Sequence, residues 1–171
     1  MIIALDCHYT ETGAAAAACG ITAWTHGELA AHHRITDAVP HDYVPGEFYR
    51  RELPLILRVL SEIDWPLEAI LIDAYVDLAP DHPGLGRRLV EAAALALPVI
   101  GVAKTRYAGA THAIEVLRGT SSKPLLVTAA NIAVERAAEL VRGMHGANRI
   151  PTLIMHADHC ARGMDLPSAY S

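Results

Sequence analysis

The sequence contains few aromatic residues, with one Phe, two Trp and six Tyr among its 171 residues. Because large rings are scarce, aliphatic side chains and alanine must fill the interior. Charged residues are also sparse at 19%, whereas hydrophobic residues make up 52% and the mean hydropathy is +0.23. This composition excludes an intrinsically disordered chain. We expect a single domain that spans residues 1–171, because this length supports one sizeable core.

Positive charge is scarce as well, since the 14 Lys and Arg residues are outnumbered by 19 Asp and Glu residues and the net charge is −5. This deficit argues against a surface that holds nucleic acid by broad electrostatic attraction. A local basic patch is still compatible with it. A bound metal ion would likewise offset acidic residues gathered at one site.

Cysteine is rare: Cys7, Cys19 and Cys160 are scattered and form no CxxC motif. Such a set favours a reducing compartment over a disulfide framework or a zinc knuckle. No segment combines the length and the lack of charge needed to span a bilayer. The N-terminus leads directly into an apolar strand and has no signal-peptide pattern. We therefore expect a cytoplasmic protein that does not bind membranes.

The pattern of apolar residues predicts an α/β protein with a mixed central sheet flanked by helices. The expected strands cover residues 2–7, 14–24, 29–35, 69–73, 98–103 and 125–128. The second and third form a hairpin, although five consecutive alanines in 14–24 favour helix. The expected helices cover residues 48–60, 85–96, 131–145 and 152–162, and a loop covers residues 37–46. Pro54 lies inside the first helix, and Asn131 is a suitable N-cap for the third.

Two of the buried strands end on a carboxylate, Asp6 after the first and Asp73 after the fourth. Ligands of open α/β sheets bind at the carboxyl ends of the strands, so these two acids meet at one edge if the strands are neighbours. Glu52 on the first helix and Asp158 on the last are candidates to complete the set. Mg²⁺ prefers oxygen ligands and keeps water and substrate phosphate in its remaining positions. Such a site activates a water molecule against a phosphodiester.

Each acid taken alone is more often a helix cap, a turn residue or a surface charge than a ligand. An alternative metal site involves His156, His159 and Cys160, which are neighbours on a helix and are suitable zinc ligands. Their spacing matches no closed structural zinc pattern, and the chain has ten histidines, so chance clustering explains the group equally well. We prefer Asp158 as a ligand of a hard metal ion, with His159 as an auxiliary.

Two further residues are suited to contact a nucleic acid. Lys104 follows the expected strand 98–103 and could hold a phosphate as a point charge, or it is an ordinary exposed lysine. Tyr43 lies in a proline-flanked loop and could stack on a base, or it covers part of the core.

Several segments, in the same order along the chain, resemble those of the endonuclease V family. They are Asp6 beyond its strand, Tyr43-Val-Pro-Gly-Glu-Phe-Tyr-Arg-Arg-Glu52 (the family's YxPGxxxxRE), Asp73, Ile100-Gly-Val-Ala-Lys-Thr105, Lys123-Pro-Leu-Leu-Val127 and Arg149-Ile-Pro151 followed by Asp158. This resemblance covers nearly the whole chain. It implies a ribonuclease H-like fold and a Mg²⁺-dependent nuclease, with Mn²⁺ as a substitute. The family cleaves deoxyinosine-containing DNA or inosine-containing RNA at the second phosphodiester 3′ to the inosine, in DNA repair or RNA processing.

The resemblance also implies roles for single residues. Asp6, Glu52 and Asp73 match the family's metal-binding catalytic acids, and Asp158 stands where the family has His or Asp. Tyr43 matches the wedge tyrosine that fills the gap left by a flipped base, and the partner is a nucleic acid that is single-stranded or has a flipped base. The other expected substrate-binding residues are Pro45, Gly46, Gly84, Leu85 and Lys104.

The chain departs from the family in the loop after Asp73. Ala74 replaces a glycine and Ala79 replaces a histidine, and residues 128–131 replace an SPGH-like turn. A Cβ at Ala74 and the bulk of Tyr75 and Val76 are expected to narrow the base pocket, because glycine lets the backbone approach a ligand closely. The alternative function is therefore a catalytically altered member that binds nucleic acid or protein without cleaving it.

Overall fold

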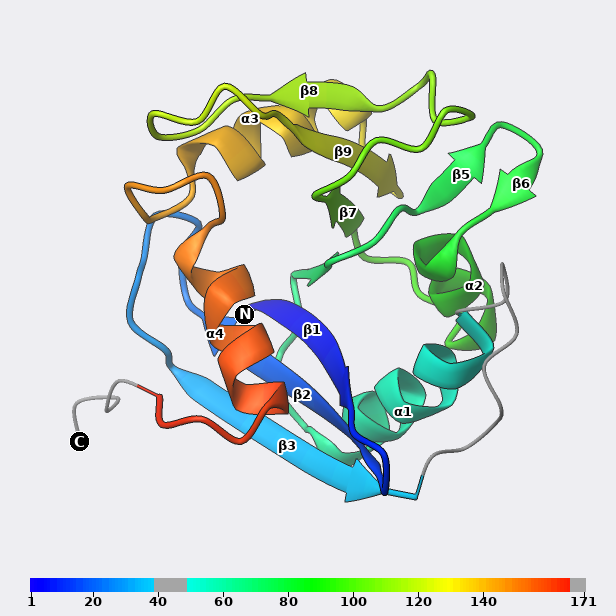
Figure 1. The fold of residues 1–171 in the computed structure, drawn as a ribbon, viewed down its shortest axis with the longest axis vertical. Coiled ribbons are helices and arrows are strands. Elements are labelled where there is room, and N and C mark those ends of the chain that lie inside the picture. The colour runs from blue at the N-terminus through cyan, green and yellow to red at the C-terminus, as the bar shows by residue number, and fades with distance from the viewer. Residues whose placement is uncertain (39–48, 167–171) are drawn as a thin grey trace.

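The structure is a computed structural model that describes residues 1–38 and 49–166. One mixed sheet of seven strands forms its centre, in the order β3-β2-β1-β4-β7-β9-β8 (Figure 1). These strands are β1 (Ile2–Tyr9), β2 (Ala14–Ile21), β3 (Ala31–Asp37), β4 (Ala69–Ile72), β7 (Val99–Ala103), β8 (Ile114–Val116) and β9 (Leu125–Ala130). β1, β4 and β7 run parallel to one another, and the other neighbours pair antiparallel. β5 (Asp77–Ala79) and β6 (His82–Pro83) form a separate ribbon.

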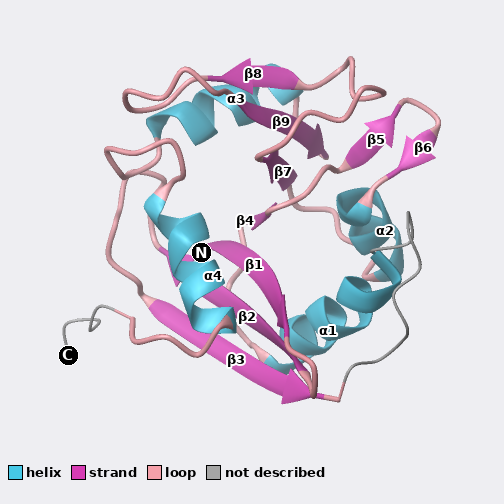
Figure 2. Ribbon diagram, in the orientation of Figure 1, coloured by secondary structure: helices cyan, strands magenta, loops and turns pink. Residues whose placement is uncertain are grey.

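Helices cover both faces of the sheet (Figure 2). α1 (Tyr49–Glu62) and α2 (Leu85–Ala92) pack on one face, where Leu55, Val59 and Leu89 are buried against the sheet. α3 (Val134–Gly143) and α4 (Thr152–Ala161) pack on the other. The predicted α/β architecture with a mixed, helix-flanked sheet is confirmed. None of the described helices has the length and apolar composition needed to cross a bilayer.

The alanine-rich segment is a strand, as predicted, and all eight residues of β2 are buried. Ala16 and Ala18 contribute to the core under α1, whereas Ala17 and Cys19 contribute to the core under α4. Two-sided burial explains why helix propensity does not decide the structure here, because a central strand needs apolar side chains on both faces. The small side chains allow both helices to pack close to the sheet.

The predicted boundaries are wrong at several places: the strand expected over residues 14–24 ends at Ile21, and the strand expected over residues 29–35 is shifted to Ala31–Asp37. Three further differences concern two helices and the short strands. The helix expected over residues 85–96 ends at Ala92. α3 begins at Val134, so Asn131 is not its cap; Asn131 instead adopts a φ of 62°. Its side-chain amide donates hydrogen bonds to the carbonyl oxygens of Leu95 and Leu97, at 2.9 and 3.0 Å, and thereby ties the end of β9 to the loop after α2. The third difference is the set of short strands β5, β6 and β8, which the apolar pattern does not predict.

The register of the parallel strands positions the two strand-end acids. Leu5 of β1 lies opposite Ile72, the last residue of β4, so Asp6 within β1 and Asp73 directly after β4 come next to each other. The loop that follows Asp73 crosses closely over Gly101 of β7, where a Cβ atom would lie 2.4 Å from the carbonyl oxygen of Ala74. The prediction that both acids follow the ends of their strands is confirmed for Asp73 and wrong for Asp6, because β1 continues to Tyr9 and Asp6 pairs with Ala17 of β2.

Candidate functional site

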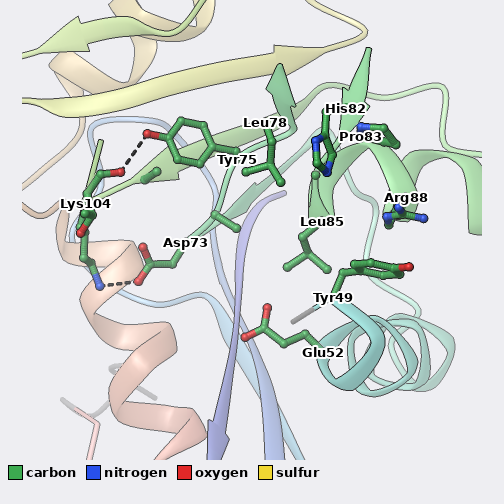
Figure 3. Close-up of a pocket in the computed structure, with 14 residues that line it drawn as sticks. Tyr49, Glu52, Asp73, Tyr75, Leu78, His82, Pro83, Leu85, Arg88 and Lys104 are labelled. Carbon is green, nitrogen blue, oxygen red and sulfur yellow. Dashed lines mark hydrogen bonds and ion pairs between the residues drawn. The ribbon is translucent and has the colours of Figure 1, made fainter. Parts of the chain in front are cut away.

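A pocket with a cavity volume of about 350 Å³ opens beside the carboxyl ends of β4 and β7 (Figure 3). Its walls come from α1, α2 and the segments that follow those two strands. Five of the predicted site residues line it: Glu52, Asp73, Gly84, Leu85 and Lys104. The predicted residues Tyr43, Pro45 and Gly46 lie outside the described residues.

Asp73 lies at the centre of this region. Its Oδ2 accepts a hydrogen bond from the Lys104 ammonium in an ion pair (Figure 3). Asp6, on the adjacent strand, uses Oδ1 to accept a hydrogen bond of 2.8 Å from the backbone N–H of Cys7. Asp158 on α4 accepts a hydrogen bond of 2.8 Å from Arg162 one turn later. Two of the four predicted metal-binding acids are thus paired with cations of the protein itself.

The carboxylates affect one another electrostatically. Burial raises the pKa of the Asp6 carboxyl to about 6; the charges of Asp73 and Asp158 add to this effect, while the Cys7 amide and Lys104 oppose it. Burial also raises the pKa of Glu52 to about 8, and the charges of Asp6 and Asp73 raise it further. Glu52 is only 9% exposed. Four acids from two strand ends and two helices therefore share one partly desolvated region.

The donor set suits a hard divalent cation, because it consists of carboxylates whose mutual repulsion a cation would relieve. The present side-chain positions are not those of a coordination shell: within residues 1–38 and 49–166, no three His, Cys, Asp or Glu side chains gather closely enough to hold a metal ion. Lys104 and Arg162 supply the counter-charge in this arrangement. The residues fit Mg²⁺ by chemistry, and each of these ion pairs uses only one oxygen of its carboxylate.

The alternative zinc cluster is not assembled. Cys160 is buried and shares a hydrogen bond with Cys19 of β2. His156 lines a different pocket, together with His26 and His145. Side chains three and four residues apart on a helix share a face only roughly, and here the packing of α4 on the sheet separates their surroundings.

The loop after Asp73 differs in part from the expectation. Ala74 and Tyr75 line the pocket as expected, and the Tyr75 hydroxyl donates to the carbonyl of Thr105 at 2.8 Å. Val76 does not narrow the pocket, because its side chain is fully buried in the core under α2. Its backbone N–H donates to Thr128 Oγ1 at 2.8 Å. Thr128, from the segment that replaces the family's SPGH-like turn, thus anchors this loop.

Sequence reasoning missed Tyr49, His82 and Arg88, which also line the pocket. Arg88 Cζ lies 3.6 Å from the centre of the Tyr49 ring. A signal for Arg88 existed, because it lies three residues after Leu85 on a predicted helix and so faces the same side. Tyr49 and His82 follow no such periodicity, since their place depends on how α1 and the β5–β6 ribbon pack.

A second groove, of about 420 Å³, adjoins the pocket at Lys104. Its lining includes four cationic residues and one carboxylate: Lys104, Arg106, Lys123, Arg149 and Glu115. Lys104 and Lys123 are the two lysines of the chain. Arg106 pairs with Glu115, and Arg149 donates to the carbonyl oxygens of Lys104 and Pro124. The acidic protein therefore has a local basic groove that begins at the candidate site.

The raised pKa of Glu52 predicts an unusual dependence of stability on pH. The native protein keeps a proton on Glu52 up to about pH 8, whereas the unfolded chain releases it near 4.5. Because the native state then binds more protons, the free energy of unfolding falls as pH rises through this window. In chelator at pH 8, Glu52→Gln should be more stable than the wild type by about 2 to 4 kcal/mol, and the difference should vanish near pH 4.

Urea unfolding of both proteins between pH 4 and 9 measures this difference. Glu139→Gln is the control, because Glu139 is an exposed residue of α3. Parallel stability curves for the wild type and Glu52→Gln would show that Glu52 ionises normally in the native state.

Comparison with known proteins identifies the family. Residues 1–129 match the family model described as Endonuclease V. The endonuclease V of Streptomyces coelicolor is 30% identical over 132 residues, which are 75% of this chain and 53% of that protein. The endonuclease V of Nostoc punctiforme is 31% identical over 130 residues, which are 73% of this chain and 58% of that protein. The chain thus spans little more than half the length of these relatives.

Solved structures have the same fold. Endonuclease V from Streptomyces avermitilis superposes with a TM-score of 0.78 at 26% identity, covering 95% of this chain and 79% of that one. Endonuclease V from Ciona intestinalis, in complex with a 23mer DNA containing an inosine followed by a ribo-adenosine, has a TM-score of 0.76 at 15% identity and covers 95% and 83%. The protein has the ribonuclease H-like fold of these structures and belongs to the endonuclease V family.

Proposed function

We propose that this protein is a metal-dependent endonuclease that hydrolyses phosphodiester bonds in nucleic acid. The observation that carries the proposal is the register of β1 and β4, which brings Asp6 and Asp73 to one sheet edge within electrostatic range of Glu52 and Asp158. Two buried acids whose pKa values are raised by burial and by neighbouring carboxylates, beside a pocket, are typical of a functional site. Membership of the endonuclease V family supports the reaction type.

Asp6, Glu52, Asp73 and Asp158 would hold Mg²⁺, or Mn²⁺ in its place. When bound, the metal supplies a Lewis acid that activates water and neutralises charge on the phosphodiester. Before that, Glu52 holds a proton at neutral pH, so it loses this proton when it becomes a ligand. Lys104 pairs with Asp73 in the metal-free protein and lies at the pocket, where its ammonium can turn to a phosphate oxygen.

The pocket would receive a base turned out of its strand. Enzymes that act next to a particular base take it into a pocket lined by apolar and aromatic groups. Tyr49, Tyr75, Leu78 and Leu85 supply such a lining here. We propose inosine as the recognised nucleoside on the strength of kinship with the family, even though Ala74 replaces the glycine of that loop.

The test is cleavage of single strands that carry one inosine, in DNA and in RNA, beside strands with adenosine at that position. Reactions contain Mg²⁺, Mn²⁺ or chelator. We expect cleavage near the inosine with either metal and none in chelator. Absence of cleavage of every strand with both metals would overturn the nuclease proposal.

Cations along the basic groove would hold the backbone of the bound strand. Each phosphate contact adds about 0.7 to the slope of log affinity against log salt for a single strand. Lys123→Gln should therefore weaken binding of single-stranded DNA and reduce this slope by about 0.7. Fluorescence anisotropy in chelator at several salt concentrations measures both quantities.

The control for the groove is Arg136→Gln on α3, which removes an equal charge from a residue that does not line the groove. Among the described residues, Arg136 pairs only with the exposed Glu139. Equal slopes of log affinity against log salt for the wild type and Lys123→Gln would show that Lys123 of the groove does not contact a phosphate of the bound strand.

A second candidate function is a nucleic-acid-binding protein without nuclease activity. The ion pairs of Lys104 with Asp73 and of Arg162 with Asp158 favour it, because they satisfy two acids without a metal. Isothermal titration with Mg²⁺ and Mn²⁺ separates the two functions. Metal binding that is lost in Asp73→Asn supports the nuclease, and tight strand binding with no metal uptake supports the binding protein.

A further inference from the structure

Arg88 is a cation of the pocket that has neither a carboxylate nor a hydrogen-bond acceptor as a partner among the described residues. It lies in the second turn of α2 and lines the pocket with Tyr49, Leu85 and Asp73. Its side chain makes no hydrogen bond or ion pair with any residue in the described ranges, and its Nε is buried without a hydrogen-bond partner. A buried donor without an acceptor is unfavourable by itself, and the terminal N–H groups of Arg88 also have no acceptor among the described residues.

The neighbouring Arg87 shows what an ordinary structural arginine does in this helix. Arg87 binds the Asp77 carboxylate through Nε at 3.1 Å and through Nη2 at 2.7 Å. That two-pronged ion pair fixes the β5–β6 ribbon to α2. Arg88 has no such acid, and its guanidinium instead lies over the Tyr49 ring (Figure 3). Stacking on a ring holds a guanidinium in place without using its N–H donors.

A stacked guanidinium presents a planar fork of donors, which matches two acceptors that lie side by side in one plane. The O6 and N7 atoms of a 6-oxopurine are such a pair, and their contact with arginine is the commonest base-specific contact of this kind. Adenine offers N7 next to an amino donor, and thymine and uracil have an N–H donor between their two carbonyl oxygens. The mainly apolar walls of the pocket suit the faces of a purine ring.

We propose that Arg88 is a specificity-determining residue that reads the O6 and N7 atoms of a 6-oxopurine held in the pocket. Arg88 would then distinguish hypoxanthine, xanthine and guanine from adenine, thymine and uracil. This inference rests on the proposed function, because it assumes that the pocket receives a base of the strand to be cut.

The experiment compares single DNA strands that differ at one base: hypoxanthine, 7-deazahypoxanthine or adenine. Their affinity for the wild type, Arg88→Met and Arg88→Lys is measured by fluorescence anisotropy in chelator. The wild type should bind the hypoxanthine strand about tenfold more tightly than the other two, since each arginine–base pair of this kind discriminates by about 1 to 3 kcal/mol. Arg88→Met should bind all three strands alike, with the adenine strand unchanged within about twofold of wild type. Arg88→Lys keeps the charge but not the fork, so it should also lose most of the preference.

Arg142→Met on α3 is the matched control, because Arg142 is exposed on a helix outside the pocket. Circular dichroism and thermal melting of each variant establish that it is folded. An equal loss of affinity for all three strands in Arg88→Met would assign Arg88 to a phosphate and overturn the inference. A wild-type preference that survives in Arg88→Met, or the absence of any preference in the wild type, would overturn it too.

Cleavage in Mg²⁺ separates this inference from the proposed function. If the wild type cuts strands but shows no dependence on N7, only the inference fails. If the wild type neither binds nor cuts any strand, the proposed function fails and the inference fails with it.

Discussion

Asp73→Asn is expected to lower the rate of strand cleavage by a factor of about 10³ or more, because a carboxylate that holds a catalytic metal contributes several kcal/mol to the transition state. Asp73 is the acid with the most connections in the site. It lies next to Asp6 at the sheet edge, raises the pKa of Asp6 and Glu52, pairs with Lys104 and lines the pocket. Asparagine has the same shape, so the loss is one of charge and not of packing.

The fold should survive this substitution and gain stability at neutral pH. Removal of the Asp73 charge lowers the pKa of Asp6 and Glu52, since that charge contributes to raising both. Single-turnover cleavage of an inosine-containing strand in Mg²⁺ gives the rate, and thermal melting in chelator gives the stability. Asp64→Asn, at an exposed position outside the pocket, is the control. A rate for Asp73→Asn within about threefold of the wild type would remove Asp73 from the metal site.

Gly101→Ala should destabilise the protein by about 3 kcal/mol or more, because the added methyl group has no space. A Cβ there would lie 2.4 Å from the carbonyl oxygen of Ala74, 2.6 Å from Thr128 Oγ1 and 2.8 Å from the backbone nitrogen of Val76. Two of these atoms belong to backbone and cannot rotate away. The substitution must therefore displace the loop that follows Asp73 or break the hydrogen bond between Val76 and Thr128.

Gly143→Ala is a closely matched control for this effect. Gly143 is the last residue of α3, and a Cβ there would meet no atom within 4 Å. Alanine favours the helix over glycine, so this variant should be more stable than the wild type by about 0.5 to 1 kcal/mol. Denaturant unfolding of both variants measures the contrast. Equal stabilities for the two variants would contradict the close approach of the loop to β7.

The sequence allowed the adjacency of Asp6 and Asp73 to be predicted because two local signals and one general rule suffice, although β1 continues beyond Asp6 to Tyr9. An apolar run marks each buried strand, the next residue is an acid, and parallel neighbouring strands bring their carboxyl ends together. The adjacency of Asp6 and Asp73 is the result. The alanine strand β2 was predictable for a similar reason, since Gly20 and Trp24 disfavour the helix that its alanines would otherwise prefer.

The errors in the predicted secondary structure arise where a residue type is compatible with two local conformations or where a strand is too short to show a pattern. Asparagine is both a good N-cap and tolerant of positive φ, and Asn131 takes the second role. The strands β5, β6 and β8 have two or three residues each, too few for any periodicity to appear. The basic groove is different again, because Arg106, Lys123 and Arg149 come from separate segments that only the folded sheet brings together.

The small side chains of β2 act as a spacer between two helices that each carry an acid of the site. α1, with Glu52, packs over Ala16 and Ala18, and α4, with Asp158, packs over Ala17. Ala17 is also the ladder partner of Asp6. A larger residue on either face would push one helix outward and carry its acid away from the strand ends. The alanines of β2 thus help to set the positions of the Glu52 and Asp158 carboxylates, although their own side chains cannot bind a metal ion or transfer a proton.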